Sequence, residues 1–149
     1  MHQSRKLAAI MFTDIVGYTA LMGEDEQKAF EVLNKNRQLQ KPLIEQHSGK
    51  WIKELGDGVM ACFNTVSDAV LAAIKIQEAC RRSNDFSLRI GIHQGEVISE
   101  GEDLFGDTVN IASRLQAKAP SEESGSLKPS ITSYRITSRS QPNMWDLNR

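Results

Sequence analysis

Residues 7–14, which read LAAIMFTD, and residues 51–63, which read WIKELGDGVMACF, decide the fold of this chain. The first stretch begins with a short run that is almost entirely apolar, which is typical of a buried central strand, and the predicted strand ends at Asp14. In the second stretch a Gly-Asp-Gly turn separates two apolar runs, which predicts a hairpin with Asp57 on its turn. If the two strands are neighbours, both carboxylates lie at one end of one sheet.

Paired carboxylates with few nitrogen or sulfur ligands nearby suit hard cations such as Mg²⁺ or Mn²⁺. Phosphate oxygens of a substrate usually complete the coordination of such a cation. The segment of Val16, Gly17, Tyr18 and Thr19 leaves the first strand and opens a helix, so its free backbone N–H groups can hold a phosphate. Either aspartate alone is explained by turn conformation. The combination indicates metal-assisted phosphoryl chemistry.

Composition narrows the classes of protein that remain. The chain has 149 residues, enough for one domain with its own core, and a formal net charge of −1, which argues against a nucleic acid or an anionic membrane as partner. No apolar run approaches the ~20 residues that span a bilayer, and the start of the chain lacks a signal-peptide cleavage site. Cys62 and Cys80 have no metal or redox spacing and are expected to be core thiols. These features predict a cytoplasmic protein.

The periodicity predicts helices alternating with strands. Residues 24–47 form a helix that Pro42 should kink or split, and Ser67 can cap the next helix. Residues 88–92 alternate as a half-buried strand, Gly95 turns the chain, and residues 108–118 form the last helix. This order predicts an α+β sandwich of helices on a mainly antiparallel sheet.

Three polar side chains admit two interpretations from spacing alone. Asn110 and Arg114 are four residues apart on the last helix, hence on one face, and they form either a solvated polar stripe or part of a site. Lys53 lies on a predicted strand and is equally well explained as an exposed-face residue.

Four ordered motifs resemble the catalytic domain of class III nucleotidyl cyclases, the adenylate and guanylate cyclases. They are Phe12–Ile15, Lys53 with Gly56–Gly58, Gly91–Gly95 and Phe105–Arg114, and the resemblance spans residues 5–119. It implies a ferredoxin-like sandwich of helices on a mainly antiparallel sheet. It also implies a homodimer, arranged head to tail, with active sites between the subunits.

The resemblance assigns the metal ligands. Asp14 and Asp57 resemble the two metal-binding aspartates of the family, and Ile15 would lend its backbone carbonyl to two Mg²⁺ or Mn²⁺ ions per site. In the family these groups come from one subunit and face the substrate-reading residues of the other.

The resemblance also assigns the residues that hold the nucleotide. Lys53 and Asp103 stand where the family reads the purine, and a lysine donor with an acidic acceptor matches the edge of adenine, so the pair argues for ATP. Asn110 and Arg114 match the residues that orient the ribose and stabilise charge on the transferring phosphoryl group.

The implied function is an adenylate cyclase that makes cyclic AMP and pyrophosphate from ATP by two-metal catalysis. A weak or inactive cyclase-like module that binds nucleotide or pairs with a partner subunit is the first alternative. A metal-dependent nucleotidyltransferase acting on nucleic acid is the second, and the neutral charge argues against it.

Residues 120–149 depart from the family pattern, which continues with further strands and a lysine that binds the triphosphate. Here Ser, Thr, Pro, Arg and Asn prevail without periodicity, which predicts a disordered tail and a sheet with incomplete C-terminal strands. Codons for residues 124–131 can be chosen so that a shifted frame reads like the family. A frame change near Pro120 in the encoding DNA is therefore one hypothesis for this tail.

Overall fold

The computed structural model describes residues 3–119 and the backbone of residues 133–136. Its elements, in chain order, are β1 (Gln3–Ile15), α1 (Tyr18–Glu24), α2 (Glu26–Gln46), β2 (Lys50–Leu55), β3 (Gly58–Phe63), α3 (Val66–Ser83), β4 (Leu88–Glu100), β5 (Asp103–Phe105), α4 (Asp107–Lys118) and β6 (Ser133–Ile136).

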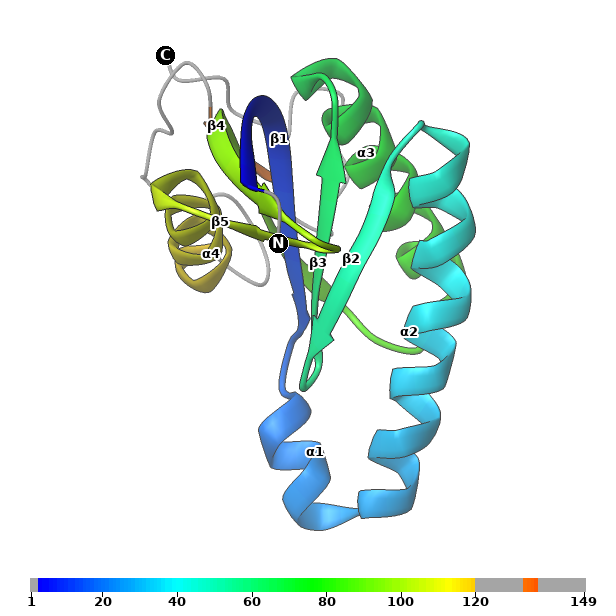
Figure 1. The fold of residues 1–149 in the computed structure, drawn as a ribbon. Helices are drawn as coiled ribbons and strands as arrows, with labels where there is room; N and C mark the ends of the chain where they lie inside the picture. Colours follow the sequence, from blue (N-terminus) through cyan, green and yellow to red (C-terminus); the bar gives the residue numbers. More distant parts are fainter. Residues whose placement is uncertain (1–2, 120–132, 137–149) are drawn as a thin grey trace.

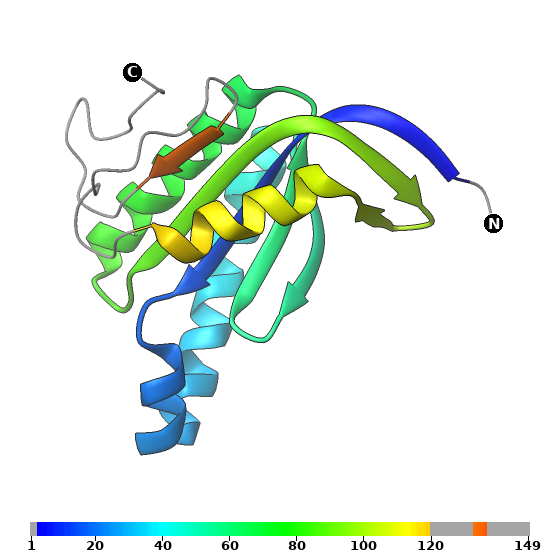
Figure 2. The same ribbon diagram turned by 90° about the vertical axis from the view of Figure 1, so that its left-hand side faces the viewer.

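The sheet confirms the predicted antiparallel architecture. Its strand order is β2-β3-β1-β4-β5, with β6 paired to β4, and each pairing is antiparallel. The chain order β1, helix, β2, β3, helix, β4 with this spatial order is that of a ferredoxin-like unit. Helices α2 and α3 cover one face of the sheet, and α4 lies on the other face along β4 (Figures 1 and 2).

Strand β1 is central, as its apolar run predicts. Alternate residues Ala9, Met11 and Ile15 pack in the core under α2 and α3. The intervening residues, Ile10 and Phe12 among them, pack in a second core with Ala112 of α4. Both faces of β1 are buried from Ala8 to Thr13, which is why that part of its sequence lacks the alternation of a half-exposed strand.

Three local expectations are wrong. Helix α2 runs without interruption through Pro42, which lies near its C-terminal end. The missing N–H of Pro42 costs one hydrogen bond of the helix, and Ile44, two residues further on, is fully buried. Thr65, not Ser67, caps α3, because its side chain accepts a 3.1 Å hydrogen bond from the Asp68 N–H.

Gly95 does not turn the chain; it lies within the continuous strand β4. A Cβ built there would lie 2.4 Å from Thr108 Oγ1, so the glycine permits the start of α4 to approach the strand. The turn comes later, at Gly101 between β4 and β5, where φ is 62°.

The remaining expectations fall partly outside the described residues. Cys62 and Cys80 are buried free thiols, as expected, and burial raises the pKa of Cys80 to about 12. Within the stretch predicted to lack regular structure, the backbone of residues 133–136 forms β6 on β4, and the rest of that stretch lies outside the described residues. Among the described helices, none is long and apolar enough to cross a membrane.

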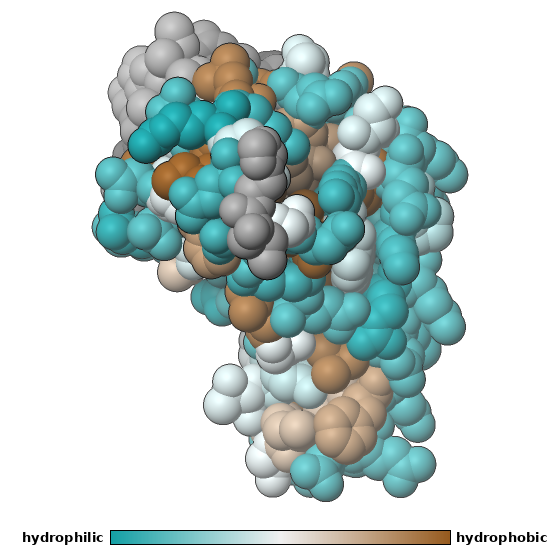
Figure 3. Space-filling view, viewed as in Figure 1, coloured by the Kyte–Doolittle hydropathy of each residue, from teal (hydrophilic) through white to brown (hydrophobic). Residues whose placement is uncertain are grey.

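One end of the molecule extends beyond the sheet. Helix α1 has no buried residue and, with the first half of α2, projects past the ends of β1 and β3 (Figure 1). Apolar side chains gather on the surface at this end (Figure 3), and Phe30 of α2 is 48% exposed.

Candidate active site

The ends of β1 and the β2–β3 hairpin meet, so Asp14 and Asp57 lie at one end of the sheet. Strands β1 and β3 are direct neighbours, and the register pairs Thr13 with Val59. The Asp57 carboxylate accepts a 2.9 Å hydrogen bond from the backbone N–H of Ile15. One predicted carboxylate is therefore held directly by the strand that carries the other.

Arg89 joins this end of the sheet, and sequence reasoning missed it. It faces Asp14 across β1 and β4, and its Nε donates to the Asp14 carboxylate at 3.1 Å. Both side chains are partly exposed, 31% for Arg89 and 25% for Asp14. An arginine on an alternating strand carries no signal of its own, since its partner is known only once the register is known.

The segment after β1 supplies fewer free amides than expected. The N–H of Val16 donates to the Ser87 carbonyl at 2.9 Å, so this member of the predicted phosphate-binding segment is already satisfied. Gly17 adopts a positive φ of 74° and opens α1. The N–H groups of Tyr18 and Thr19 lie in the first turn of α1 and have no intrahelical partner, so they remain available to an anion.

Lys53 and Asp103 form an ion pair across the curled sheet. Lys53 Nζ donates to Asp103 at 3.0 Å, and the other Asp103 oxygen accepts from the Leu104 N–H at 2.8 Å. The hydrogen bond from Lys53, then that from the Leu104 backbone, lowers the pKa of Asp103. The two residues come from β2 and β5, the two edges of the five-strand path, and β5 crosses over the face of the sheet toward β2 (Figure 1).

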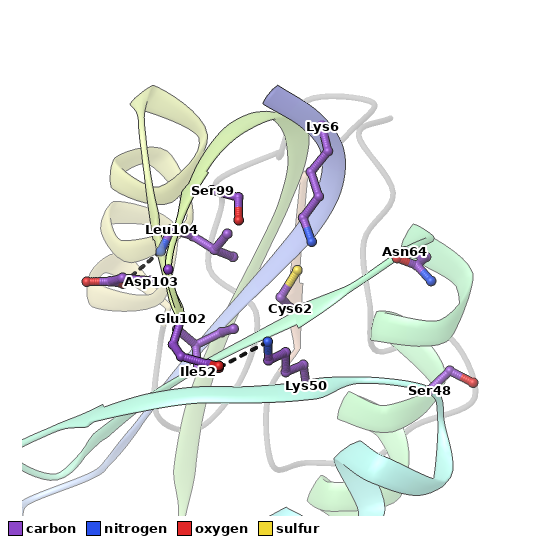
Figure 4. Close-up of a pocket in the computed structure, with 11 residues that line it drawn as sticks. Lys6, Ser48, Lys50, Ile52, Cys62, Asn64, Ser99, Glu102, Asp103 and Leu104 are labelled. Carbon is purple, nitrogen blue, oxygen red and sulfur yellow. Dashed lines mark hydrogen bonds and ion pairs between the residues drawn. The ribbon is translucent and has the colours of Figure 1, made fainter. Parts of the chain in front are cut away.

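A polar pocket of about 210 Å³ lies beside this pair, with Asp103 at its margin. Figure 4 shows Lys6 and Cys62 directed toward its interior and Lys50 paired with Glu102, at 3.2 Å. Burial raises the pKa of Cys62, and the charges of Lys6 and Lys50 only partly oppose this. The thiol therefore stays protonated near neutral pH and offers no nucleophile.

Asn110 and Arg114 lie exposed on one face of α4. Neither makes a hydrogen bond or ion pair with another described residue of the predicted site. The structure therefore unites Asp57 with the end of β1, and Lys53 with Asp103, but leaves the α4 pair apart from both.

The donor set at the end of β1 fits a hard cation. Asp14, Asp57 and the Ile15 carbonyl supply oxygen only, and the described residues contain no cluster of three or more His, Cys, Asp or Glu side chains suited to a metal. A cation there would need oxygen atoms from a substrate to complete its coordination.

Comparison with known proteins shows the family of the chain. The family model described as "Adenylate and Guanylate cyclase catalytic domain" matches residues 1–137, most of the chain. The chain belongs to this family. The matched residues include all four motifs, which lie between residues 12 and 114.

Individual proteins similar to this chain are also described as cyclases. A putative adenylate cyclase 3 of Rhizobium meliloti is 37% identical over 77% of this chain and 21% of its own length. An adenylate cyclase of Streptomyces coelicolor is 32% identical over 76% of this chain and 30% of its own length. The crystal structure of an adenylate/guanylate cyclase/hydrolase from Silicibacter pomeroyi superposes with a TM-score of 0.74 and 36% identity, covering 80% of this chain and 74% of that one. The chain thus spans less than a third of the length of these two curated relatives.

The cyclase domain also contains an ion pair between α2 and β2. Arg37 of α2 donates two hydrogen bonds to Glu54, at 2.7 and 2.8 Å, next to Lys53. Hydrogen bonding to Arg37 lowers the pKa of Glu54, the charges of Arg37 and Lys41 act in the same direction, and burial opposes them.

This ion pair predicts a pH dependence of stability. Because the folded pKa of Glu54 lies below its unfolded value, the pair stabilises the domain above the unfolded pKa, and that contribution is lost as the pH falls through the folded pKa. Glu54→Gln should therefore reduce the difference in urea-unfolding free energy between about pH 7 and about pH 4. Glu31→Gln, a change of an exposed glutamate on α2, the helix that carries Arg37, is the control and should leave the difference unchanged. An unaltered pH dependence in Glu54→Gln would contradict the prediction.

Proposed function

We propose that this chain is the catalytic part of an adenylate cyclase that converts ATP to 3′,5′-cyclic AMP and pyrophosphate. The observation that carries the choice of ATP is the Lys53–Asp103 ion pair, at 3.0 Å. Together the two side chains present a donor and an acceptor, the pattern that complements the N1 and amino edge of adenine. Family membership alone includes both adenylate and guanylate cyclases.

Asp14, Asp57 and the carbonyl of Ile15 would hold Mg²⁺ or Mn²⁺, two ions per site. Bound ions would make the ribose 3′-hydroxyl a better nucleophile and neutralise the pyrophosphate leaving group. The 3′-hydroxyl gives its proton to solvent, its oxygen bonds to the α-phosphorus, and the bond from the α-phosphorus to pyrophosphate breaks.

The chain's own residues prepare this reaction. The Ile15 N–H orients the Asp57 carboxylate, and the Arg89 guanidinium stands at the same end of the sheet, where it can pair with phosphate oxygens. The first-turn amides of Tyr18 and Thr19 add donors for the triphosphate. Arg114 would place fixed positive charge where the transition state becomes more negative.

The site is completed by a second copy of the chain. Asn110 and Arg114 are exposed and make no hydrogen bond or ion pair with Asp14 or Asp57 within the described part of one chain. In a two-fold homodimer one copy would supply the metal-binding carboxylates, and the other would supply the purine pair with Asn110 and Arg114. Each dimer then has two equivalent sites, and a monomer has none that is complete.

The direct test is formation of cyclic AMP and pyrophosphate from ATP with Mn²⁺, with GTP assayed in parallel. We expect equal amounts of the two products, turnover that increases with dimer concentration, and preference for ATP. A chain that binds ATP with Mn²⁺ but forms no cyclic AMP would instead be a nucleotide-binding module. The same assay on a version with the coding frame restored after Pro120 shows what the tail contributes.

Exchanging the purine-reading pair should change the substrate. Lys53→Glu with Asp103→Cys reverses the donor and acceptor pattern, and each unmatched buried hydrogen-bonding group costs on the order of 1–3 kcal/mol. The ratio of kcat/KM for ATP to that for GTP should fall by roughly tenfold or more.

A matched control reverses a neighbouring charge. Lys50→Glu alters the same strand, but Lys50 pairs with Glu102 and not with Asp103. It should leave the ATP to GTP ratio unchanged. If the double variant is folded and dimeric and keeps the wild-type ratio, the purine-reading role is wrong.

A further inference from the structure

Helix α2 carries two sets of polar residues, each spaced four residues apart, one set buried against the sheet and the other exposed beside its edge strand. Asn36 and Gln40 are buried against β1, and Arg37 and Lys41 lie along the edge strand β2. Most of the sheet-facing side chains of such a helix are expected to be apolar. These polar exceptions contact the two strands that carry the candidate site.

The pair on β1 forms a closed hydrogen-bonded group. Gln40 is 0% exposed, Asn36 2% and Thr13 1%. Gln40 Nε2 donates to Asn36 Oδ1 at 2.7 Å and to Thr13 Oγ1 at 3.0 Å, and the Thr13 hydroxyl lies 3.4 Å from Gln40 Oε1. Because buried polar groups are costly when unpaired, the three side chains constrain one another strongly.

This hydrogen-bonded group is linked to the candidate active site through the backbone of β1. Thr13 directly precedes Asp14, and Ile15, two residues on, donates its N–H to Asp57. Successive side chains of a strand point to opposite faces, so Thr13 is held from the α2 side while Asp14 points to the other side. Movement of Thr13 would move the Asp14 carboxylate, the Ile15 carbonyl and the amide that orients Asp57.

The second contact is weaker. Arg37 makes two hydrogen bonds to Glu54, which lies between Lys53 and the hairpin turn, but its side chain is 44% exposed and that of Glu54 30%. Exposed ion pairs contribute little compared with a satisfied buried network. The hydrogen bond between Gln40 and Thr13 is therefore the contact with the larger expected effect.

We propose that α2 is a positioning element of the active site, in which Gln40, through Thr13, holds the end of β1 and so sets the positions of Asp14, the Ile15 carbonyl and the amide that orients Asp57. Gln40 and Thr13 touch neither metal nor substrate. The proposal rests on the proposed cyclase function for its effect on turnover. Its structural part concerns the end of β1 alone.

The test removes the Thr13 hydroxyl without changing the shape of the side chain. Thr13→Val loses the hydrogen bond with Gln40, and Thr13→Ser keeps it. The first readout is exchange of the Ile15 N–H, measured by NMR. Thr13→Val should accelerate this exchange about tenfold or more relative to the amides of residues 8–11, because local opening at the strand end becomes easier. Thr13→Ser should stay within about twofold of wild type.

Metal binding gives the second readout, and turnover the third. Mn²⁺ binding is measured from the EPR signal of free Mn²⁺ with 3′-deoxy-ATP present, and the Mn²⁺ concentration for half-saturation should rise about tenfold in Thr13→Val. In turnover assays of the same variant, kcat should fall by a similar factor, and KM for ATP should change less than about twofold. Thr13→Ser should restore both values. Ile76→Val removes a buried methylene from α3 in the same core and should leave all three readouts unchanged, which separates positioning from a general loss of stability.

The outcomes separate this proposal from the proposed function. If Ile15 exchange and Mn²⁺ binding are the same in Thr13→Val as in wild type, α2 does not position the site, whatever the turnover. If both respond but the wild-type chain forms no cyclic AMP, the cyclase function fails and the positioning role stands. Should Thr13→Val not fold, Gln40→Met removes the same hydrogen bond from the helix side. Gln40→Met is judged by the same two readouts, and wild-type values of both Ile15 exchange and Mn²⁺ binding in that variant would overturn the proposal.

Discussion

Asp57→Ala should lower metal-dependent cyclic AMP formation by at least about a thousandfold, and Asp14→Ala should do the same. Each change removes one of the two carboxylates that would hold the cations. The described residues contain no group of three or more His, Cys, Asp or Glu side chains that could hold a metal, so no third acidic side chain can replace the lost ligand. The remaining donor, the Ile15 carbonyl, is neutral and cannot balance the charge of two divalent ions.

Neither change should unfold the protein. Asp57→Ala leaves the Ile15 N–H without its acceptor, and Asp14→Ala leaves Arg89 without its partner. The Ile15–Asp57 hydrogen bond is only part-buried and the Arg89 side chain is 31% exposed, so water can replace either lost contact at a cost of about 1 kcal/mol, small against a typical stability of about 5–15 kcal/mol. Circular dichroism and urea unfolding should therefore remain close to wild type.

The control is an aspartate outside the site. Asp85→Ala removes an exposed carboxylate whose contact is a 3.5 Å ion pair with Lys35, and its turnover should equal that of wild type. Wild-type activity in folded Asp14→Ala or Asp57→Ala protein would refute the assignment of both residues as metal ligands.

Mixing two inactive variants, Asp57→Ala and Arg114→Ala, should restore activity. If the carboxylates and Arg114 of one site come from different subunits, a mixed dimer contains one intact site and one site with both defects. Random pairing of equal amounts makes about half of the dimers mixed, each with one of two sites working. Recovered turnover should therefore approach roughly a quarter of that of wild type.

The mixing experiment needs proof of heterodimers and a parent with measurable activity, so the frame-restored version is the appropriate background if the present chain turns over slowly. Differently tagged variants, co-purified through both tags, provide that proof. As a control, Asp14→Ala mixed with Asp57→Ala should stay inactive, because every site takes both carboxylates from one chain and each chain lacks one of them. Activity no greater than the sum of the separate variants, in proven heterodimers, would favour a site built within one chain.

Much of the fold follows from local sequence. The unbroken apolar run before Asp14 predicts a central strand because both of its faces are covered, and the glycines around Asp57 predict the hairpin because few other residues turn so tightly. Local reasoning failed at Gly95, whose small size serves close packing against Thr108 and not a turn. It failed again at Pro42, because tertiary packing of Ile44 keeps the helix intact across the proline.

By itself the sequence determined the strand and helix order, the two aspartates next to glycine turns, and the four motifs that identify the cyclase family. Each of these depends on residues close together along the chain, where propensity and spacing act directly. The tertiary structure alone decided which distant residues meet. Arg89 faces Asp14 because of the β1–β4 register, Lys53 meets Asp103 because the sheet curls until its two edges approach, and Gln40 reaches Thr13 because α2 packs across β1. Those contacts arise from register, sheet curvature and helix packing, which are set by burial of the whole core and leave no signal in any single stretch of sequence.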